Sequence, residues 1–460
     1  MGRSAGVALC CFVLLFSSLA LAQTAASPGE PVVPAEPVVA VPAPPVVLTP
    51  SVAPAPAPTP PPGITALTTK NGFKLSFDGY LTAGFTTSTA GRFFFIPTKD
   101  DNESVRDPNV GRNDGFGIDD ARINLRASYK ERLYARIGLD ASVVRYTDAN
   151  SPSGEVTVGV KNAYLSFKFH NLATLWAGRF KPPFDMESLT PVFEQYFVRR
   201  ALESRGVVRN EGIGNDLHGF DQGYQVGMML SGSQALSRRQ SLEYALAVTN
   251  GSKATMSLND NDLPAVYARM SLTTGKEENG DEEGPATQNN KKTEGLYSVL
   301  GIGGFYNRVS SGNAPDKISD DVGAASFDAT VNWRMFHFRG HRWMFRFRGQ
   351  VIYQLTDRDI GNVKEHALGG HAQLSVNIIP MWDDLFLSYR YAYYDPRFRR
   401  TGGTGTSEDF ARVMHHTVGL RYAPSNWPII MLLDYTRSLE EGGRSIPNDI
   451  VALAGQVLFR

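Results

Sequence analysis

Apolar and polar residues alternate one by one along much of this chain, most clearly over residues 121–143. Between 121 and 129 the odd positions hold apolar residues, whereas the even positions hold polar ones such as Arg122 and Arg126. The alternation resumes at Leu133, after three charged residues. Because successive side chains of a strand point to opposite faces, the pattern predicts two neighbouring strands that each have one apolar and one arginine-bearing face.

The same period of two residues recurs in sixteen segments. Their predicted bounds are 74–87, 117–129, 133–146, 157–169, 173–181, 219–231, 241–250, 263–273, 295–308, 324–336, 343–356, 365–378, 384–394, 412–423, 429–437 and 450–460. Repeated strands of roughly ten residues with one apolar face are typical of a transmembrane β-barrel, in which apolar side chains contact lipid. A soluble β-sandwich also alternates, but it turns its apolar face toward a core. We therefore expect an all-β fold, a transmembrane antiparallel β-barrel of 16 strands.

The connections between these segments alternate between short and long, as they do in outer-membrane barrels. Short turns are expected at 130–132 and 170–172, and longer loops at 88–116 and 147–156. Residues 274–294 break the rhythm, because they are long and charged where a short turn is expected. The even number of strands predicts that both termini lie on the periplasmic side.

The N-terminal part of the chain predicts two segments outside the barrel. Residues 1–22 contain a basic residue, an apolar run and a small-residue cleavage site, which predicts a secretory signal peptide rather than a transmembrane anchor. Residues 23–69 are rich in Pro, Ala and Val and predict a stiff periplasmic linker in the polyproline II conformation. The barrel domain is expected over 70–460, in the bacterial outer membrane. Both cysteines lie in the signal segment, so we expect a mature chain without thiols.

The total charge is balanced, with 46 basic and 46 acidic residues, but its distribution is uneven. Acidic residues gather in predicted loops, whereas arginine recurs on the polar face of the strands. If the apolar face contacts lipid, the other face lines the pore with Arg122, Arg126, Arg136, Arg334, Arg346, Arg348, Arg390 and Arg421. Basic rings in a narrow pore favour anions, and guanidinium suits phosphate and carboxylate. The alternative is that these arginines are struts paired with carboxylates, without preference for a solute.

The longest predicted loop, 182–218, is too long for an ordinary connection. Its middle is apolar and aromatic, and we expect this third long loop to fold into the lumen and narrow the pore. It would bring four arginines to the constriction, namely Arg199, Arg200, Arg205 and Arg209. Glutamates of the same loop, such as Glu187 and Glu203, would neutralise part of this charge.

The sequence contains no recognisable motif of an enzyme or a metal site. The histidines lack the spacing of metal ligands, no Gly-x-Ser-x-Gly elbow is present, and the glycine-rich stretch 301–304 is not followed by the Lys-Ser/Thr of a phosphate loop. We therefore expect a protein that is not an enzyme, with no catalytic residue, metal or cofactor. The balanced charge gives no reason to expect nucleic acid as a partner.

Residues 162–190, NAYLSFKFHNLATLWAGRFKPPFDMESLT, resemble the phosphate-selective porin O and P family. In that family two strands and a G-[RQ]-[FY]-K-P-P-F-like motif precede a long constricting loop. Further similar stretches follow in the same order, up to HTVGLRYAPSNWPIIMLLDYTRS at 416–438. The resemblance covers about 75–460 and implies a homotrimeric, sixteen-stranded barrel whose third loop selects anions.

Pattern and resemblance together predict a passive outer-membrane channel for small anions, such as phosphate or polyphosphate-like solutes. Its partners would be these solutes, outer-membrane lipid and other copies of the same chain. The alternative is a general-diffusion porin, or one for carboxylate or neutral solutes, in which the arginines provide only an electric field and phosphate is not preferred.

Overall fold

The computed structural model of the chain describes seventeen stretches. They are residues 64–69, 71–88, 95–97, 104–106, 115–143, 156–208, 217–237, 239–251, 263–275, 295–311, 318–338, 341–358, 363–379, 385–401, 412–424, 427–441 and 449–459. The predicted signal peptide, 1–22, and most of the predicted linker, 23–69, lie outside them. Within these stretches, none of the helices has the length and apolar character needed to cross a membrane.

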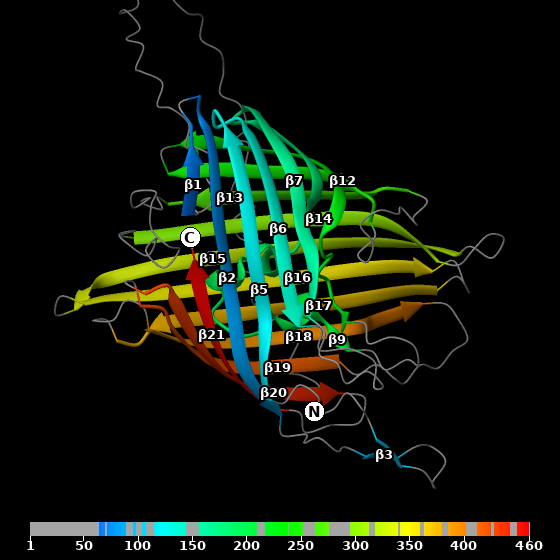
Figure 1. Cartoon of the computed structure of the whole chain (residues 1–460). Coiled ribbons are helices and arrows are strands. Elements are labelled where there is room, and N and C mark those ends of the chain that lie inside the picture. Colours follow the sequence, from blue (N-terminus) through cyan, green and yellow to red (C-terminus); the bar gives the residue numbers. More distant parts are fainter. Residues whose placement is uncertain are drawn as a thin grey trace, which may run out of the picture. The chain divides into compact units, whose positions relative to one another are not determined.

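Sixteen antiparallel strands form one closed ring (Figure 1). They are β2 (Phe73–Ser88), β5 (Gly115–Tyr129), β6 (Leu133–Val143), β7 (Val156–His170), β8 (Ala173–Phe180), β11 (Gln225–Ser237), β12 (Gln240–Thr249), β13 (Ala265–Thr274), β14 (Gly295–Ser311), β15 (Ile318–Phe338), β16 (His341–Arg358), β17 (Val363–Asn377), β18 (Leu385–Thr401), β19 (Arg412–Tyr422), β20 (Ile429–Glu441) and β21 (Ile450–Phe459). Each strand pairs with the next. The last strand returns to the first, from Gly79 paired with Phe459 to Ser88 paired with Ile450. The prediction of a sixteen-stranded antiparallel barrel is confirmed.

Apolar side chains cover the outside of this ring, and polar side chains are buried on its inner face. In β17, Gln373 and Ser375 are buried, whereas Leu374 between them is exposed. In β21, Gln456 is buried and its neighbour Val457 is exposed. This division is the reverse of a soluble β-sandwich, and it is stable where hydrocarbon contacts the outer face.

Most observed strands agree with the predicted ones within a few residues. Some strands extend further into the loops than predicted, and one strand is displaced as a whole. The segment predicted at 219–231 is displaced, because β11 begins only at Gln225. Before it, the side chain of Asp221 accepts a hydrogen bond from the backbone N–H of Gly223 at 2.9 Å, and Gly223 has a φ of 66°. This left-handed turn ends the extended backbone and leaves residues 219–224 in the preceding connection.

A short strand, β1 (Ile64–Thr68), lies within the range predicted as linker. It pairs with β2 from Thr68 opposite Lys74 to Ile64 opposite Phe77, and the pairing of β21 with β2 begins at Gly79. β1 therefore occupies the part of the edge of β2 that β21 leaves uncovered. Regular structure thus starts before residue 70, where the barrel was predicted to begin.

The tight turn at 130–132 shows how the shortest connections are made. Lys130 and Glu131 both have positive φ, 48° and 56°, and the N–H of Arg132 donates to the carbonyl of Tyr129 at 3.1 Å. Two successive left-handed residues define a type I′ turn, whose twist matches that of the flanking strands. Much of the unusual long connection at 274–294 lies outside the described residues.

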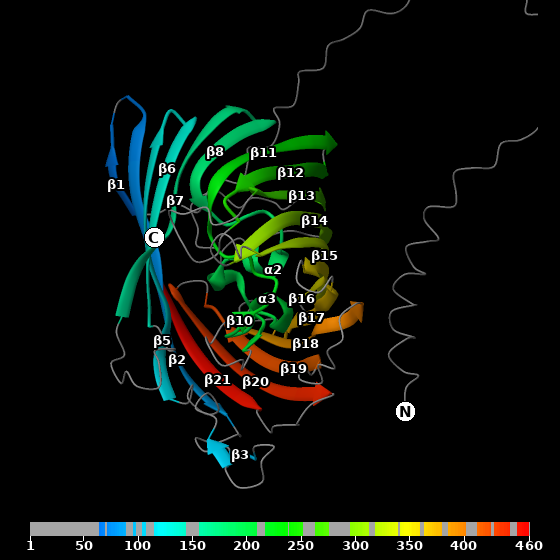
Figure 2. The same cartoon turned by 90° about the vertical axis from the view of Figure 1, so that its right-hand side faces the viewer.

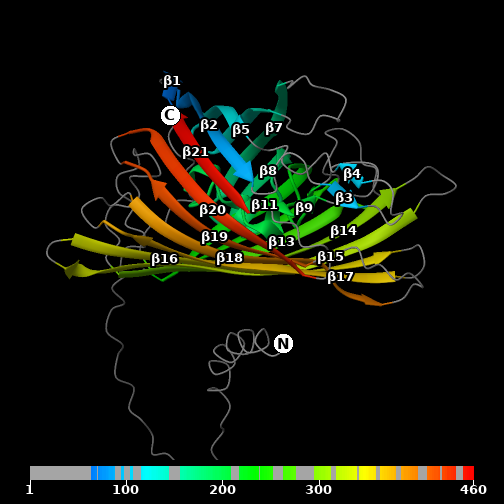
Figure 3. The ribbon, with the colours of Figure 1, turned by 90° about the horizontal axis from the view of Figure 1, so that it is seen from below.

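The strands are not equally long around the ring. From β14 to β18 they have 15 to 21 residues, whereas β6, β8, β12 and β13 have only 8 to 11. The long strands lie side by side in Figure 3, from green through yellow to orange. All five of these strands receive contacts from the connection described next.

Candidate functional site

The connection between β8 and β11, residues 181–224, has the richest set of polar contacts outside the strand ladders. We call it the long connection; its described parts are 181–208 and 217–224. It contains two one-turn helices, α2 (Met186–Leu189) and α3 (Leu202–Arg205), a 3₁₀ turn at Val192–Glu194 and a small pair of strands, β9 (Val207–Val208) and β10 (Leu217–His218). Figure 2 draws α2 and α3 with strands on either side of them.

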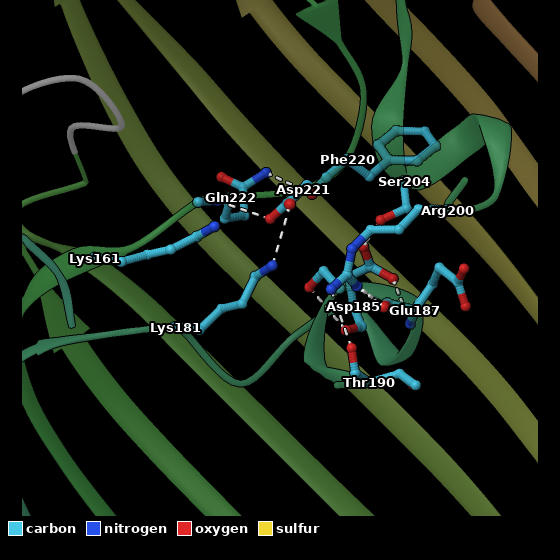
Figure 4. Close-up of polar contacts among 12 residues, drawn as sticks. Lys161, Lys181, Asp185, Glu187, Thr190, Arg200, Ser204, Phe220, Asp221 and Gln222 are labelled. Atoms are coloured by element: carbon cyan, nitrogen blue, oxygen red, sulfur yellow. Dashed lines mark hydrogen bonds and ion pairs between the residues drawn. The ribbon is translucent and has the colours of Figure 1, made fainter. Parts of the chain in front are cut away.

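Asp185 fixes the start of the long connection at three points (Figure 4). Its Oδ1 accepts hydrogen bonds from the backbone N–H of Glu187 at 3.0 Å and from Nε2 of Gln350 in β16 at 2.7 Å. Its Oδ2 accepts one from Oγ of Ser204 at 2.5 Å. The side chain therefore caps α2 and joins it to α3 and to the barrel. Burial raises the pKa of Asp185, and the hydrogen bonds from Ser204 and Gln350 only partly offset that rise.

Two other contacts attach the long connection to strands far apart in the ring. The carbonyl of Phe184 accepts hydrogen bonds from Arg269 of β13 at 3.0 Å and from Ser326 of β15 at 3.2 Å. The backbone N–H of Val198 donates to Oδ2 of Asp434 in β20 at 2.5 Å. The connection thus reaches from one side of the inner face to the other.

A buried ion pair holds α3 against β17. Oε1 of Glu203 lies 2.5 Å from Nδ1 of His371, and both side chains are fully buried. Phe220, further along the connection, packs edge-on against Tyr394 of β18 with ring centres 5.4 Å apart. These contacts bury charged and aromatic groups together, so they stabilise one position of the connection.

Four arginines on the inner faces of β16, β18 and β19 lie close to this segment: Arg346, Arg348, Arg390 and Arg421. We call this set the arginine wall. Arg348, Arg390 and Arg421 expose only 8%, 5% and 5% of their surface. All four were predicted from the alternation as pore-lining residues. They are on the polar face, but they are covered by the long connection rather than fully open to the enclosed space.

The arginine wall binds the long connection mainly through neutral groups. Arg390 donates to the carbonyl of Arg199 at 3.0 Å, and its guanidinium lies 4.4 Å from the ring centre of Phe197. Arg421 donates to the carbonyl of Phe193 at 3.3 Å. The guanidiniums of Arg346 and Arg421 each lie 5.2 Å from the ring centre of Tyr196. Such cation–π contacts and carbonyl bonds hold the guanidinium without cancelling its charge.

Glu187 supplies a carboxylate beside this wall. Its Oε1 lies 3.7 Å from Arg390 and accepts the backbone N–H of Ala201 at 3.0 Å. Arg200 donates to the carbonyls of Glu187 and Thr190, so it braces α2 from within the connection. Burial alone would raise the pKa of Glu187, but His371, Arg390, Arg348 and Arg200 outweigh burial and lower it to about 2.

A second basic group lies around Tyr224, at the end of the long connection. Arg122 of β5 and Lys161 of β7 each have their charged end 5.9 Å from the centre of its ring, and Lys181 has its Nζ 5.6 Å away. We call Arg122, Lys161, Lys181 and Tyr224 the Tyr224 cluster. Its cations have carboxylate partners, since Asp140 contacts both Arg122 and Lys161, and Asp221 lies 3.1 Å from Lys181.

The other predicted arginines fall into three groups: struts between strands, residues of the long connection, and residues whose side chains the structure does not describe. Nε of Arg126 pairs with Asp78 at 2.7 Å, and Arg136 donates to the amide oxygen of Asn124 at 3.3 Å. Arg199 and Arg205 are half-buried in the long connection. The side chain of Arg334 in β15 and the whole of Arg209 lie outside the described residues.

Sequence reasoning missed Lys161, and a β-bulge explains why. Gly138 of β6 pairs with Asn162 and Leu139 pairs with Val160, so Lys161 is the extra residue of β7. A strict period of two would place Lys161 on the same face as Leu165, which is exposed. The bulge instead lets its ammonium group reach Asp140. Within the described residues, no three or more His, Cys, Asp or Glu side chains are grouped to hold a metal ion.

The model of the family described as phosphate-selective porin O and P matches residues 99–296. The resemblance predicted from the sequence is confirmed over this part, which contains the long connection and the Tyr224 cluster. The arginine wall lies beyond the matched part. No curated protein matches the chain in sequence.

Several solved porin structures are similar to the barrel. The anion-selective porin from Comamonas acidovorans is 12% identical, with 84% of this chain and 100% of that chain covered and a TM-score of 0.49. The outer membrane channel DcaP of Acinetobacter baumannii is 14% identical, with 85% and 99% covered and a TM-score of 0.46. Salmonella typhi OmpF, in complex with daunomycin, is 12% identical, with 85% and 99% covered and a TM-score of 0.47. At these scores the likeness carries no argument about the solute of this chain.

Proposed function

We propose that this porin-type barrel, which matches the phosphate-selective porin O and P family over residues 99–296, is a passive outer-membrane channel for small anions. The observation that carries the proposal is the arginine wall. Its four guanidiniums gather at one part of the inner face, where they donate to carbonyls and lie over aromatic rings of the long connection, with the Glu187 carboxylate 3.7 Å from Arg390. Positive charge in a narrow, weakly screened space favours anions over cations.

We further propose that the long connection forms the constriction and that solute passes beside it, along the Tyr224 cluster. Support comes from the contacts of the connection with β13, β15, β16, β18 and β20, which hold it against the inner face. Phosphate is the preferred anion in this proposal, because guanidinium and ammonium groups match its oxygens. In line with the family, we expect the chain to act as a homotrimer, delivered to the outer membrane by the signal peptide at 1–22.

Single-channel recording in planar bilayers tests the proposal. The current of the wild-type channel in a potassium chloride gradient should reverse at a potential of the sign set by chloride, and phosphate should reduce the chloride current. Arg346→Gln should weaken both effects, because it removes a charge beside Tyr196. The matched control is Arg437→Gln, since Arg437 is exposed on the outer face of β20 and should leave both unchanged.

One set of contacts favours a second candidate function, a general-diffusion channel without phosphate preference. Arg126 with Asp78 and Arg269 with Asp328 form ion pairs at 2.7 Å, as expected of struts. In that case the chloride current would be insensitive to phosphate, and neutral solutes would pass at rates set by their size alone. Liposome swelling with uncharged sugars, compared with phosphate block, separates the two candidates.

A further inference from the structure

Tyr224 stands at the only described place where cations from three separate parts of the chain approach one aromatic ring. Arg122 comes from β5, Lys161 from the bulge of β7, and Lys181 from the residue after β8. The guanidinium of Arg122 also hydrogen-bonds the Tyr224 side chain. The ring and its hydroxyl therefore use interactions that these cations would otherwise offer to a solute.

The backbone before Tyr224 is built to hold the ring in this position. Asp221 accepts the N–H of Gly223 at 2.9 Å and also pairs with Lys181 at 3.1 Å (Figure 4). Gly223 has a φ of 66°, which favours glycine, and a Cβ at that position would have no atom within 4 Å. The turn thus sets Tyr224 beside Lys181, and the open space lies at the neighbouring Gly223.

The cations of the cluster outnumber its carboxylates, so a further acceptor can interact with them. Asp140 and Asp221 pair with its cations and Asp120 lies 3.9 Å from Lys161, whereas Arg179 of β8 adds a fourth cation that acts electrostatically on Tyr224, so four cations face three carboxylates. Burial raises the pKa of the Tyr224 phenol, but Arg122, Lys181 and Lys161 outweigh burial, so the net shift is downward. The phenol oxygen therefore lies among cationic donors, which are also suited to an anion.

We propose that Tyr224 is a specificity-determining residue that keeps anion binding weak, because its hydroxyl competes with the passing anion for Arg122 and the two lysines. This inference deepens the proposed function and rests on it. A channel conducts only if its sites bind solute strongly enough to admit it and weakly enough to release it. A tethered phenol lowers the affinity of a basic cluster without removing its charge, which keeps the selectivity for anions.

The test compares phosphate block of the chloride current in the wild-type chain, Tyr224→Phe and Tyr389→Phe. Tyr224→Phe keeps the ring and its cation–π contacts but removes the hydroxyl, so half-block should need roughly tenfold less phosphate, which corresponds to about 1.4 kcal/mol. Tyr389→Phe is the matched control, because that hydroxyl bonds His416 on the outer face, with ring centres 6.2 Å apart. Its phosphate block should equal that of the wild-type chain.

An unchanged or weakened phosphate block in Tyr224→Phe would overturn the inference. The reversal potential of the same channels in a chloride gradient reports on the proposed function separately. A wild-type channel that prefers cations contradicts the proposed function, whatever the substitution does. A channel that prefers anions but shows equal block in all three proteins contradicts only the role of Tyr224.

Discussion

The arginine wall and the Tyr224 cluster are both basic, but they hold their charges in different ways. Arg390 and Arg421 of the wall donate to backbone carbonyls, at 3.0 Å and 3.3 Å, and lie over aromatic rings. In the Tyr224 cluster, Arg122 lies 3.5 Å from Asp140, and Lys181 lies 3.1 Å from Asp221. A carbonyl occupies a donor but leaves the net charge, whereas a carboxylate cancels it. In this account the wall supplies the field that selects anions, and the cluster moderates how strongly they are held.

The difference also bears on stability. Burying guanidiniums is costly, and the carbonyl bonds, ring contacts and the Glu187 carboxylate of the long connection offset part of that cost. The wall therefore depends on the long connection, which supplies the carbonyls of Phe193 and Arg199 and the rings of Tyr196 and Phe197. The Tyr224 cluster is less dependent, because two of its cations share Asp140 of the barrel itself.

The largest effect is expected from releasing the long connection at Asp185. Asp185→Ala leaves the amide of Gln350 and the hydroxyl of Ser204 without this acceptor, at about 1–3 kcal/mol for each buried group, and leaves the N–H of Glu187 with only the side-chain oxygen of Gln350 at 3.2 Å. The connection should detach while the barrel stays folded. Limited proteolysis should then cut within residues 181–224. Anion selectivity should also fall, because the connection no longer lies against the inner face.

Asp185→Asn is the matched control for that release. The amide of this variant has nearly the shape of the native carboxyl group and keeps one oxygen as an acceptor. Protection of the connection should be mostly retained. Equal cleavage of Asp185→Ala and the wild-type chain would show that Asp185 does not hold the connection in place.

A smaller effect on anion selectivity is expected from substituting single arginines. It distinguishes an arginine that contributes to selectivity from one that only pairs with a carboxylate as a strut. Arg390→Gln removes a charge that has carbonyl partners, and the chloride-to-potassium permeability ratio should fall about fivefold, equivalent to about 1 kcal/mol. The double substitution Arg126→Gln with Asp78→Asn removes a guanidinium and its carboxylate together, so the ratio should stay unchanged. Reversal potentials measure both. The comparison of the two regions fails if the double variant loses as much selectivity as Arg390→Gln.

The smallest effect concerns acid sensitivity at Glu187. Its pKa is lowered from 4.5 to about 2 in the folded chain, so the ionised carboxylate stabilises the connection above pH 4.5. That contribution, up to about 3 kcal/mol, is lost progressively as the pH falls through about 2. Pepsin cleavage of the connection should therefore accelerate between these values in the wild-type chain. In Glu187→Gln the extra acid-dependent acceleration should be absent, and its presence there would assign the effect to another group.

The barrel could be predicted from the sequence because its signal is local. A period of two places Gln373 and Leu374 on opposite faces, whatever lies elsewhere in the chain. The residues of the arginine wall followed from the same rule. The contacts of these arginines could not be predicted, because the alternation indicates the face on which a side chain lies but not which segment covers that face.

The rest of the site depends on geometry that no local pattern reveals. Asp185 meets Ser204 and Gln350, which are 19 and 165 residues further along the chain. Lys161 turns inward through a bulge that a strict alternation assigns to the lipid side. Tyr224 was placed inside a strand, because the turn at Asp221 and Gly223 was not recognised. Such turns and bulges re-aim single side chains without changing the hydropathy pattern.

The sign of the reversal potential of the unmodified channel, in a potassium chloride gradient across a planar bilayer, tests the central claim most directly. Potassium and chloride differ mainly in charge, so the sign reports the field that a permeating ion meets. If the guanidiniums of β16, β18 and β19 dominate that field, the current reverses toward the equilibrium potential of chloride. A reversal toward that of potassium would contradict the account, since it would mean that carboxylates, not arginines, govern passage.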